Sequence, residues 1–117
     1  EQMNASSASV PFDTDEFDLA GLERGAGRRV RPPLVAAAPA NLECRVVKIV
    51  DLPPQAEGEV ISSLVIGRVV AVHIRDEFIN SQGRFDTRRA NPIVRLGGFN
   101  YATLGELFEM PRPELSP

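Results

Sequence analysis

The fold is decided by the stretch VISSLVIGRVVAVHIR, residues 60–75, in which apolar side chains occupy both alternating positions of an extended chain. A strand that is apolar on both faces is typical of one buried in a sandwich or barrel. Gly67 lies in its middle, where a glycine usually marks a bend, a bulge or close approach by another group. We therefore predict a curved barrel strand over residues 60–75.

A second strand precedes this one. Residues 42–50 begin by alternating apolar and polar side chains, in the order Leu42, Glu43, Cys44, Arg45 and Val46. Period-two alternation is typical of a half-buried strand. Pro53 and Pro54 end the pattern, and the polar residues 55–59 form a turn. The two segments predict an antiparallel hairpin.

Helix signals are short and local. Asp13 and Glu16 have the spacing of a capping box, and Phe12 and Phe17 have that of a hydrophobic staple. They predict a helix over residues 14–20, which a glycine ends.

The C-terminal third carries weaker signals. Asp86 can cap one turn of helix through Arg89, and residues 93–96 form a short strand candidate. Thr103 and Glu106 make a second capping box and predict another short helix.

Composition agrees with one small domain over residues 1–117. The hydrophobic fraction is 43% and the charged fraction 25%, values that are ordinary for a globular domain. Ten prolines and nine glycines disfavour long helices. The prediction is an all-β fold with two or three short helices.

Charge and cysteine content exclude several classes of function. The net charge is -3, so no strong basic field is available to bind nucleic acid. The single cysteine, Cys44, forms no internal disulfide. No apolar run approaches the roughly 20 residues that span a bilayer, and no secretory signal opens the chain. We expect no membrane association and, by default, a cytoplasmic location.

Four stretches, in order and spacing over nearly the whole chain, resemble the flavin-reductase family with the FMN-binding split-barrel fold. They are Met3 to Ser7 with Asp15 to Phe17 and Ala20 to Leu22; Arg31 to Pro33 leading through Pro39 to Leu42, Glu43 and Cys44; Leu64 to His73; and Pro92 to Gly98 with Tyr101. The resemblance implies a Greek-key split barrel, of which this chain forms a part.

The resemblance also implies a function. Family members bind FMN, or use FAD, at a homodimer interface, and many pass hydride from NADH or NADPH to flavin and reduced flavin to a partner oxygenase. The expected function is NAD(P)H-dependent flavin reduction in the parent protein. The alternative is a flavin-binding or interaction module without turnover, inactive as a fragment.

One departure from the family concerns length. Family domains carry a further N-terminal half before the residue that matches Glu1, which is not methionine. We therefore expect residues 1–117 to be the C-terminal portion of one domain. Such a portion would expose strand edges and apolar surface unless something covers them.

No catalytic dyad is expected, because the cofactor performs the chemistry of hydride transfer. Tyr101 matches a family position near flavin and nicotinamide, and its ring could stack there. Arg95 could hold a phosphate or flavin carbonyl, with Gly97 and Gly98 permitting close approach. The open alternatives are a rim or core tyrosine and a surface arginine beside a tight turn.

Asn4, Ser6 and Ser7 lie in a loop that in the family passes near the flavin, although they could equally face solvent. His73 is the only histidine and a further cofactor-binding candidate, its alternative being a packed, hydrogen-bonded residue. Neither His73 nor Cys44 has a second ligand beside it in the sequence, so no metal site is predicted.

An arginine cluster precedes the first long strand. Arg24, Arg28, Arg29 and Arg31 could bind the phosphates of a nucleotide or form a solvated face. Arg68 stands where family members often carry an acidic residue, so the family's charge pattern does not transfer to that position.

Overall fold

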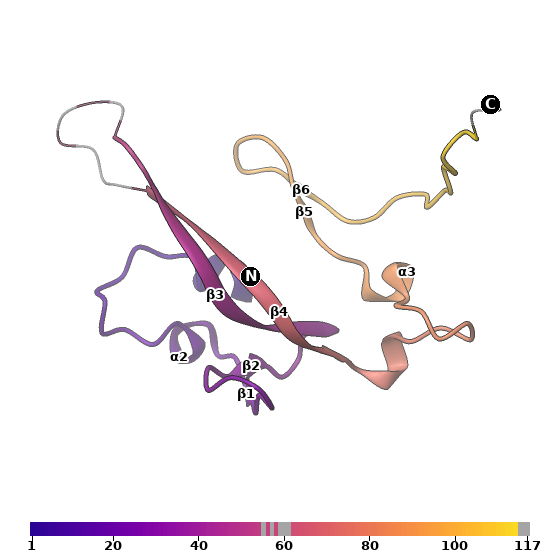
Figure 1. The fold of residues 1–117 in the computed structure, drawn as a ribbon, viewed down its shortest axis with the longest axis horizontal. Coiled ribbons are helices and arrows are strands. Elements are labelled where there is room, and N and C mark those ends of the chain that lie inside the picture. The colour runs from indigo at the N-terminus through magenta and orange to yellow at the C-terminus, as the bar shows by residue number, and fades with distance from the viewer. Residues whose placement is uncertain (55, 57, 59–61, 115–117) are drawn as a thin grey trace. The chain divides into compact units, whose positions relative to one another are not determined.

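The structure is a computed structural model and describes residues 1–54, 56, 58 and 62–114. The chain forms two units, Glu1–Ile74 and Arg75–Pro117, and each is considered by itself (Figure 1). The described part is rich in strands with a few short helices. Its strands pair as three two-stranded antiparallel sheets, none of them closed.

The first unit is built on one long hairpin. Strands β3 (Ala40–Leu52) and β4 (Ser62–Ile74) are antiparallel, from the pair Ala40 and Ile74 to the pair Leu52 and Ser62. This confirms both predicted strands and their pairing. Residues 60 and 61, and residues 55, 57 and 59 of the predicted turn, lie outside the described residues.

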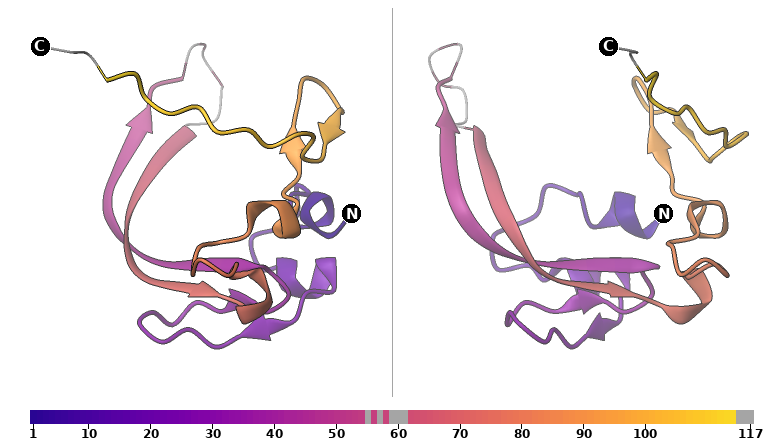
Figure 2. Two further views of the ribbon diagram at one scale, coloured as in Figure 1. Left: turned by 90° about the vertical axis from the view of Figure 1, so that its right-hand side faces the viewer. Right: turned by 45° about the vertical axis from the view of Figure 1, so that its right-hand side comes forward.

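The hairpin is bent along its length (Figure 2). Its register shifts between Glu43 and Cys44 and again between Val46 and Lys48. Each shift is a β-bulge, and bulges bend the strand that carries them. The curvature predicted from the sequence is therefore present.

Gly67 lies in the bent section and permits a close approach of the two strands. A Cβ atom at this position would lie 3.1 Å from the Cβ atom of Cys44. The prediction that this glycine marks a close approach is confirmed.

Apolar side chains on the faces of this hairpin are exposed in the described chain. Leu42, Val46 and Val72 are 59%, 63% and 58% exposed. Among the described residues, Ala20 is the one buried apolar side chain. A two-stranded hairpin with short neighbours has too little chain to cover both of its faces. The exposed apolar surface expected of a partial barrel is therefore present.

Two short helices precede the hairpin. Helix α1 covers Gln2–Ala5 and helix α2 covers Glu16–Ala20, so the predicted helix exists but begins later than expected. The Asp15 carboxylate, not that of Asp13, caps α2 by accepting a hydrogen bond from the amide of Phe17. The predicted staple is wrong.

The staple fails because its first residue lies outside the packed structure. Phe12 is fully exposed and so cannot pack across the helix start. The end of α2 follows the prediction, since Gly21 adopts a left-handed conformation with φ of 61°.

A small sheet that the sequence did not predict lies between α2 and β3. Strand β1 (Arg24–Gly25) pairs with β2 (Leu34–Val35). The Asn41 side chain bonds both backbone polar groups of Val35, at 3.1 and 3.2 Å. This amide therefore docks β2 onto the start of β3 as another strand would.

The second unit begins with one turn of 3-10 helix, η1 (Asp76–Phe78), and a short helix, α3 (Thr87–Ala90). Asp86 caps α3 by accepting from the Arg89 amide at 2.9 Å, as predicted. Asn91 ends it in a left-handed conformation.

The rest of the second unit is a two-stranded hairpin of β5 (Val94–Arg95) and β6 (Tyr101–Ala102). The helix predicted from Thr103 and Glu106 is wrong, because these residues form no regular element. Gly105 lowers the helix propensity of so short a segment.

Within the described residues, no helix has the length and apolar character needed to cross a membrane.

Candidate functional site

Glu43 in β3 is the most deeply buried side chain of the described chain, at 1% exposure. Its carboxylate accepts hydrogen bonds from three consecutive backbone amides. The N–H of Arg28 donates to Oε1 at 2.8 Å, and those of Arg29 and Val30 donate to Oε2 at 2.6 and 2.8 Å. A buried carboxylate thus organises the backbone of a loop.

His73 in β4 completes this cluster. Its Nε2 atom lies 2.5 Å from Oε1 of Glu43. The pKa of Glu43 is lowered from 4.5 to about 2, first by the amide of Arg28 and then by His73 and the other two amides, against the opposing effect of burial. Since the carboxylate is ionised, Nε2 of His73 donates in this contact.

The loop closes around Glu43 because Gly27 has no side chain. A Cβ atom there would lie 2.8 Å from the carbonyl oxygen of Val30 and 3.2 Å from Oε2 of Glu43. The cluster was missed at the sequence level, where alternation simply assigned Glu43 to the polar face of a strand. Its backbone donors lie 13 to 15 residues away in the chain and His73 lies 30 residues away, so no local pattern identifies them.

Three of the predicted site residues lie in or just after α1. Asn4 belongs to the helix, Ser6 is its C-cap and Ser7 follows. The hydroxyl of Ser6 donates to the carbonyl oxygen of Met3 at 3.0 Å, and that of Ser7 to that of Asn4 at 2.9 Å. Ser6 is half-buried, whereas Asn4 and Ser7 are exposed.

Ser6 lines a hollow of about 330 Å³ in the first unit. Its other lining residues are mostly apolar, and they are Gln2, Met3, Leu22, Val35, Ala37 and Ala38. A concave, mainly apolar wall with few polar groups is the usual character of a small-molecule site.

The other predicted group forms the β5–β6 hairpin of the second unit. Arg95 and Tyr101 are direct cross-strand partners, and the guanidinium carbon lies 6.0 Å from the ring centroid. Gly97 and Gly98 form the turn, with Gly98 at φ of 62°. The structure thus brings these four predicted residues together in one hairpin. Asn4, Ser6 and Ser7 lie together in the first unit. His73 is hydrogen-bonded to Glu43 instead.

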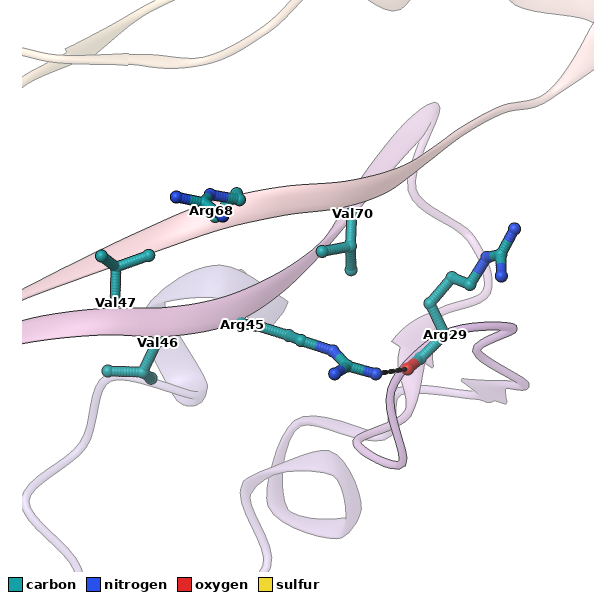
Figure 3. A pocket seen from close by; sticks show the side chains of 6 residues that line it. All are labelled: Arg29, Arg45, Val46, Val47, Arg68 and Val70. Atoms are coloured by element: carbon teal, nitrogen blue, oxygen red, sulfur yellow. Dashed lines mark hydrogen bonds between the residues drawn. The ribbon is translucent and has the colours of Figure 1, made fainter.

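A second hollow, of about 460 Å³, lies on the bent section of the β3–β4 hairpin (Figure 3). Three arginines and three valines line it, namely Arg29, Arg45, Val46, Val47, Arg68 and Val70.

The predicted arginine cluster divides between two surroundings. Arg24 is paired with Asp15 and Asp18, both at 2.8 Å, and so serves to hold α2 against β1. Arg29 instead lines the hollow beside Arg45, whose Nη2 donates to the Arg29 carbonyl oxygen at 3.4 Å.

Comparison with known proteins gives consistent matches. A protein of Halalkalibacterium halodurans, described as uncharacterized, is 33% identical over 116 residues, which is 99% of this chain and 54% of that protein. Component B of nitrilotriacetate monooxygenase from Bacillus cereus superposes with a TM-score of 0.81 at 32% identity, covering 93% of this chain and 53% of that one.

A more distant neighbour shares the fold alone. A putative flavin reductase from Shewanella frigidimarina, described as having a split barrel domain, superposes with a TM-score of 0.76 at 22% identity and covers 96% of this chain and 54% of its own. The chain therefore spans about half the length of the proteins it matches. The split-barrel prediction is confirmed by this likeness.

The family follows from a direct match. The model of the flavin reductase like domain matches residues 1–90, more than three quarters of the chain. The arrangement of strands and the sequence likeness agree, and the chain belongs to the flavin reductase like domain family.

Proposed function

We propose that the protein binds FMN and reduces it with hydride from NADH or NADPH. The observation that carries this proposal is the match of residues 1–90 to the flavin reductase like domain. The structural likeness to a monooxygenase component at 32% identity supports the same conclusion. Binding experiments decide whether FAD can replace FMN, and activity measurements decide whether NADH or NADPH is the hydride donor.

The hollow beside Ser6 fits one part of a flavin. Met3, Leu22 and Val35 offer an apolar wall to the flat ring, and Ser6 adds a polar group at its edge. Because the Ser6 hydroxyl already donates to the Met3 carbonyl, its lone pairs are left to accept from a ring N–H. We propose that Asn4 and Ser7 contribute polar contacts at the same edge.

The β5–β6 hairpin of the second unit is a separate candidate contact. Arg95 presents a guanidinium suited to a phosphate or a flavin carbonyl, and the turn at Gly97 and Gly98 has open space where side chains would stand. Tyr101 is 40% exposed, so its ring is available for stacking. We propose that these four residues contact flavin or nicotinamide, each through its own chemistry.

Bound flavin supplies the redox chemistry, since its ring accepts hydride from nicotinamide. The residues of this chain bind and orient. Tyr101 would present a flat face, Arg95 a fixed positive charge and Ser6 a hydrogen-bond acceptor. His73 would act at a distance through Glu43, which holds the loop at residues 28–30 in place. No side chain of the chain is required to transfer a proton.

Further parts of the proposal concern assembly. We propose a homodimer, in which a second subunit covers exposed apolar side chains such as Leu42 and Val72. A neighbour named as component B of a monooxygenase suggests that reduced flavin passes to a partner oxygenase. A cytoplasmic location remains a prediction of the sequence.

Flavin binding is the first test. Titrating FMN into the purified protein should quench flavin fluorescence and raise the melting temperature. Ser6→Ala and Tyr101→Leu should weaken binding, whereas Ser9→Ala and Phe108→Leu, at exposed positions that belong to neither group, should not. Addition of NADH with excess FMN should then give steady nicotinamide oxidation.

The competing function is a flavin-binding or interaction module without turnover. It is favoured by the exposed apolar side chains of the β3–β4 hairpin, such as Val46 and Ile49, which offer a surface to another chain. Flavin binding without nicotinamide oxidation would favour the binding module. A sample that neither binds FMN nor gains thermal stability from it would contradict the proposed function.

A further inference from the structure

The hollow on the β3–β4 hairpin gathers positive charge in a chain whose net charge is negative. Arg45 and Arg68 are direct partners across the two strands. Like charges directly opposite each other in a sheet are destabilising. Within the part of the chain that the structure describes, none of Arg29, Arg45 and Arg68 has a carboxylate partner. The described residues therefore supply no counter-anion to this arrangement.

The backbone at this place is also irregular on both strands. The register shifts leave Val70 as an extra residue in β4 and Val47 as an extra residue in β3, one on each side of the Arg45 and Arg68 pair. Both extra valines line the hollow. Bulges re-aim side chains and are enriched beside active sites, so the two shifts shape this surface.

The third arginine is held by its main chain. The amide of Arg29 donates to the buried Glu43 carboxylate, and its carbonyl oxygen accepts from Arg45. Figure 3 shows the Arg45 side chain extending from β3 to that carbonyl. The backbone beneath Arg29 is thus fixed, while its exposed side chain is free to turn toward a ligand.

We propose that Arg29, Arg45 and Arg68 bind the phosphate group of a nucleotide-type ligand. One guanidinium group can bind two phosphate oxygens at once. Several guanidinium groups at one site favour a dianionic phosphate over a singly charged carboxylate. Val46, Val47 and Val70 give the apolar part of such a ligand a surface beside the phosphate. This site shares no lining residue with the Ser6 hollow, and it does not depend on flavin reduction.

The first test uses inorganic phosphate as the probe, with chloride at equal ionic strength as the reference. Calorimetric titration should detect binding, and Arg45→Gln or Arg68→Gln should each weaken it roughly tenfold, since a charge-assisted hydrogen bond is lost. Arg45→Lys should restore part of the affinity. Arg88→Gln in α3, which removes the same charge from the second unit, should leave it unchanged.

Circular dichroism of each variant checks that the fold is kept, and both altered arginines are exposed. Absence of phosphate binding would overturn the proposal. So would an equal loss in Arg88→Gln and Arg68→Gln, because that result indicates screening of net charge rather than a site.

Two comparisons then identify the source of the phosphate. FMN against riboflavin tests a flavin monoester, and NADP+ against NAD+ tests a 2′-phosphate. In the pair whose phosphate occupies this site, the phosphorylated member should bind more tightly, by a margin that Arg68→Gln removes, and a margin in neither pair would overturn the proposal of a nucleotide-type ligand. Inorganic phosphate binding with no flavin affinity would support this site while contradicting the proposed function.

Discussion

Two glycine-containing turns of this chain are held in opposite ways. The loop from Gly27 to Val30 wraps the buried carboxylate of Glu43, which receives three amides and His73. The turn from Leu96 to Asn100 closes through two backbone hydrogen bonds, at 2.9 and 3.3 Å. Phe99 at its tip is 99% exposed.

The two turns differ in which interactions hold their backbone conformation. The Glu43 loop is fixed by buried, charge-assisted contacts within its own unit, and these form only when two strands and the loop are in place together. The Leu96 to Asn100 turn has no buried partner among the described residues. Segments of that kind open locally at low free energy. We expect the first turn to report global folding and the second to respond to ligand.

Removal of the Glu43 carboxylate should lower the melting temperature more than any other change considered for the two turns. Glu43→Ala leaves three backbone donors and His73 without their acceptor in a buried place. The melting temperature should fall by about 10 °C or more. Glu23→Ala, an exposed carboxylate nearby in the chain, is the control and should change it little. Equal melting temperatures for the two variants would contradict the role assigned to Glu43.

Protonation of the Glu43 carboxylate in acid should also lower the melting temperature, but by less than the Glu43→Ala substitution. The pKa of Glu43 is near 2 in the folded chain and 4.5 otherwise. Because the folded value is depressed, the stabilisation is complete above pH 4.5 and is lost as pH falls toward 2. The gap in melting temperature between the natural chain and Glu43→Gln should therefore be constant above about pH 5 and narrow below it. A gap that stays constant to pH 2 would sink this assignment.

Much of the fold was predictable because its signals are local. The alternation in residues 42–50 and 60–75 located the long hairpin, and Asp86 located α3. The β1–β2 pair was missed because two-residue strands carry no periodicity. The helix expected after Thr103 was wrong because a cap alone does not offset the missing packing.

The residues of the candidate site also fall into those that a local sequence pattern identified and those that it missed. Arg95, Gly97, Gly98 and Tyr101 are close in sequence and were found together in one hairpin. Glu43 depends on partners far along the chain, and alternation assigns any acidic residue of a strand to its polar face. Long-range hydrogen bonding of a charged group therefore has no counterpart in a local pattern.

A matched pair of glycine substitutions sharpens the contrast between the two turns. Gly27→Ala would place a Cβ atom 2.8 Å from a backbone oxygen, and it should destabilise the fold by about 1–3 kcal/mol. Gly97→Ala meets no atom within 4 Å and has no positive φ. It should lie within about 0.5 kcal/mol of the natural chain in denaturant unfolding. A larger loss in Gly97→Ala would reverse the comparison.

The smallest expected effect concerns the pair of Arg95 and Tyr101. An arginine 6.0 Å from a ring centroid at an exposed site should contribute about 0.5–1 kcal/mol. A double-mutant cycle of Arg95→Ala and Tyr101→Leu would isolate that coupling. Global melting does not report on a locally opening turn, so the readout is hydrogen exchange at the Leu96 amide, which bonds the Asn100 carbonyl.

Both single variants should speed exchange at Leu96 by a few-fold, and the double variant by little more than either. Exchange at the Arg29 amide, bonded to Glu43, should be unaffected in all three. If the pair instead proves additive, the two side chains do not support each other. The hairpin would then depend on its backbone hydrogen bonds alone, and any affinity that Tyr101→Leu costs would reflect lost contact with ligand rather than a disordered turn.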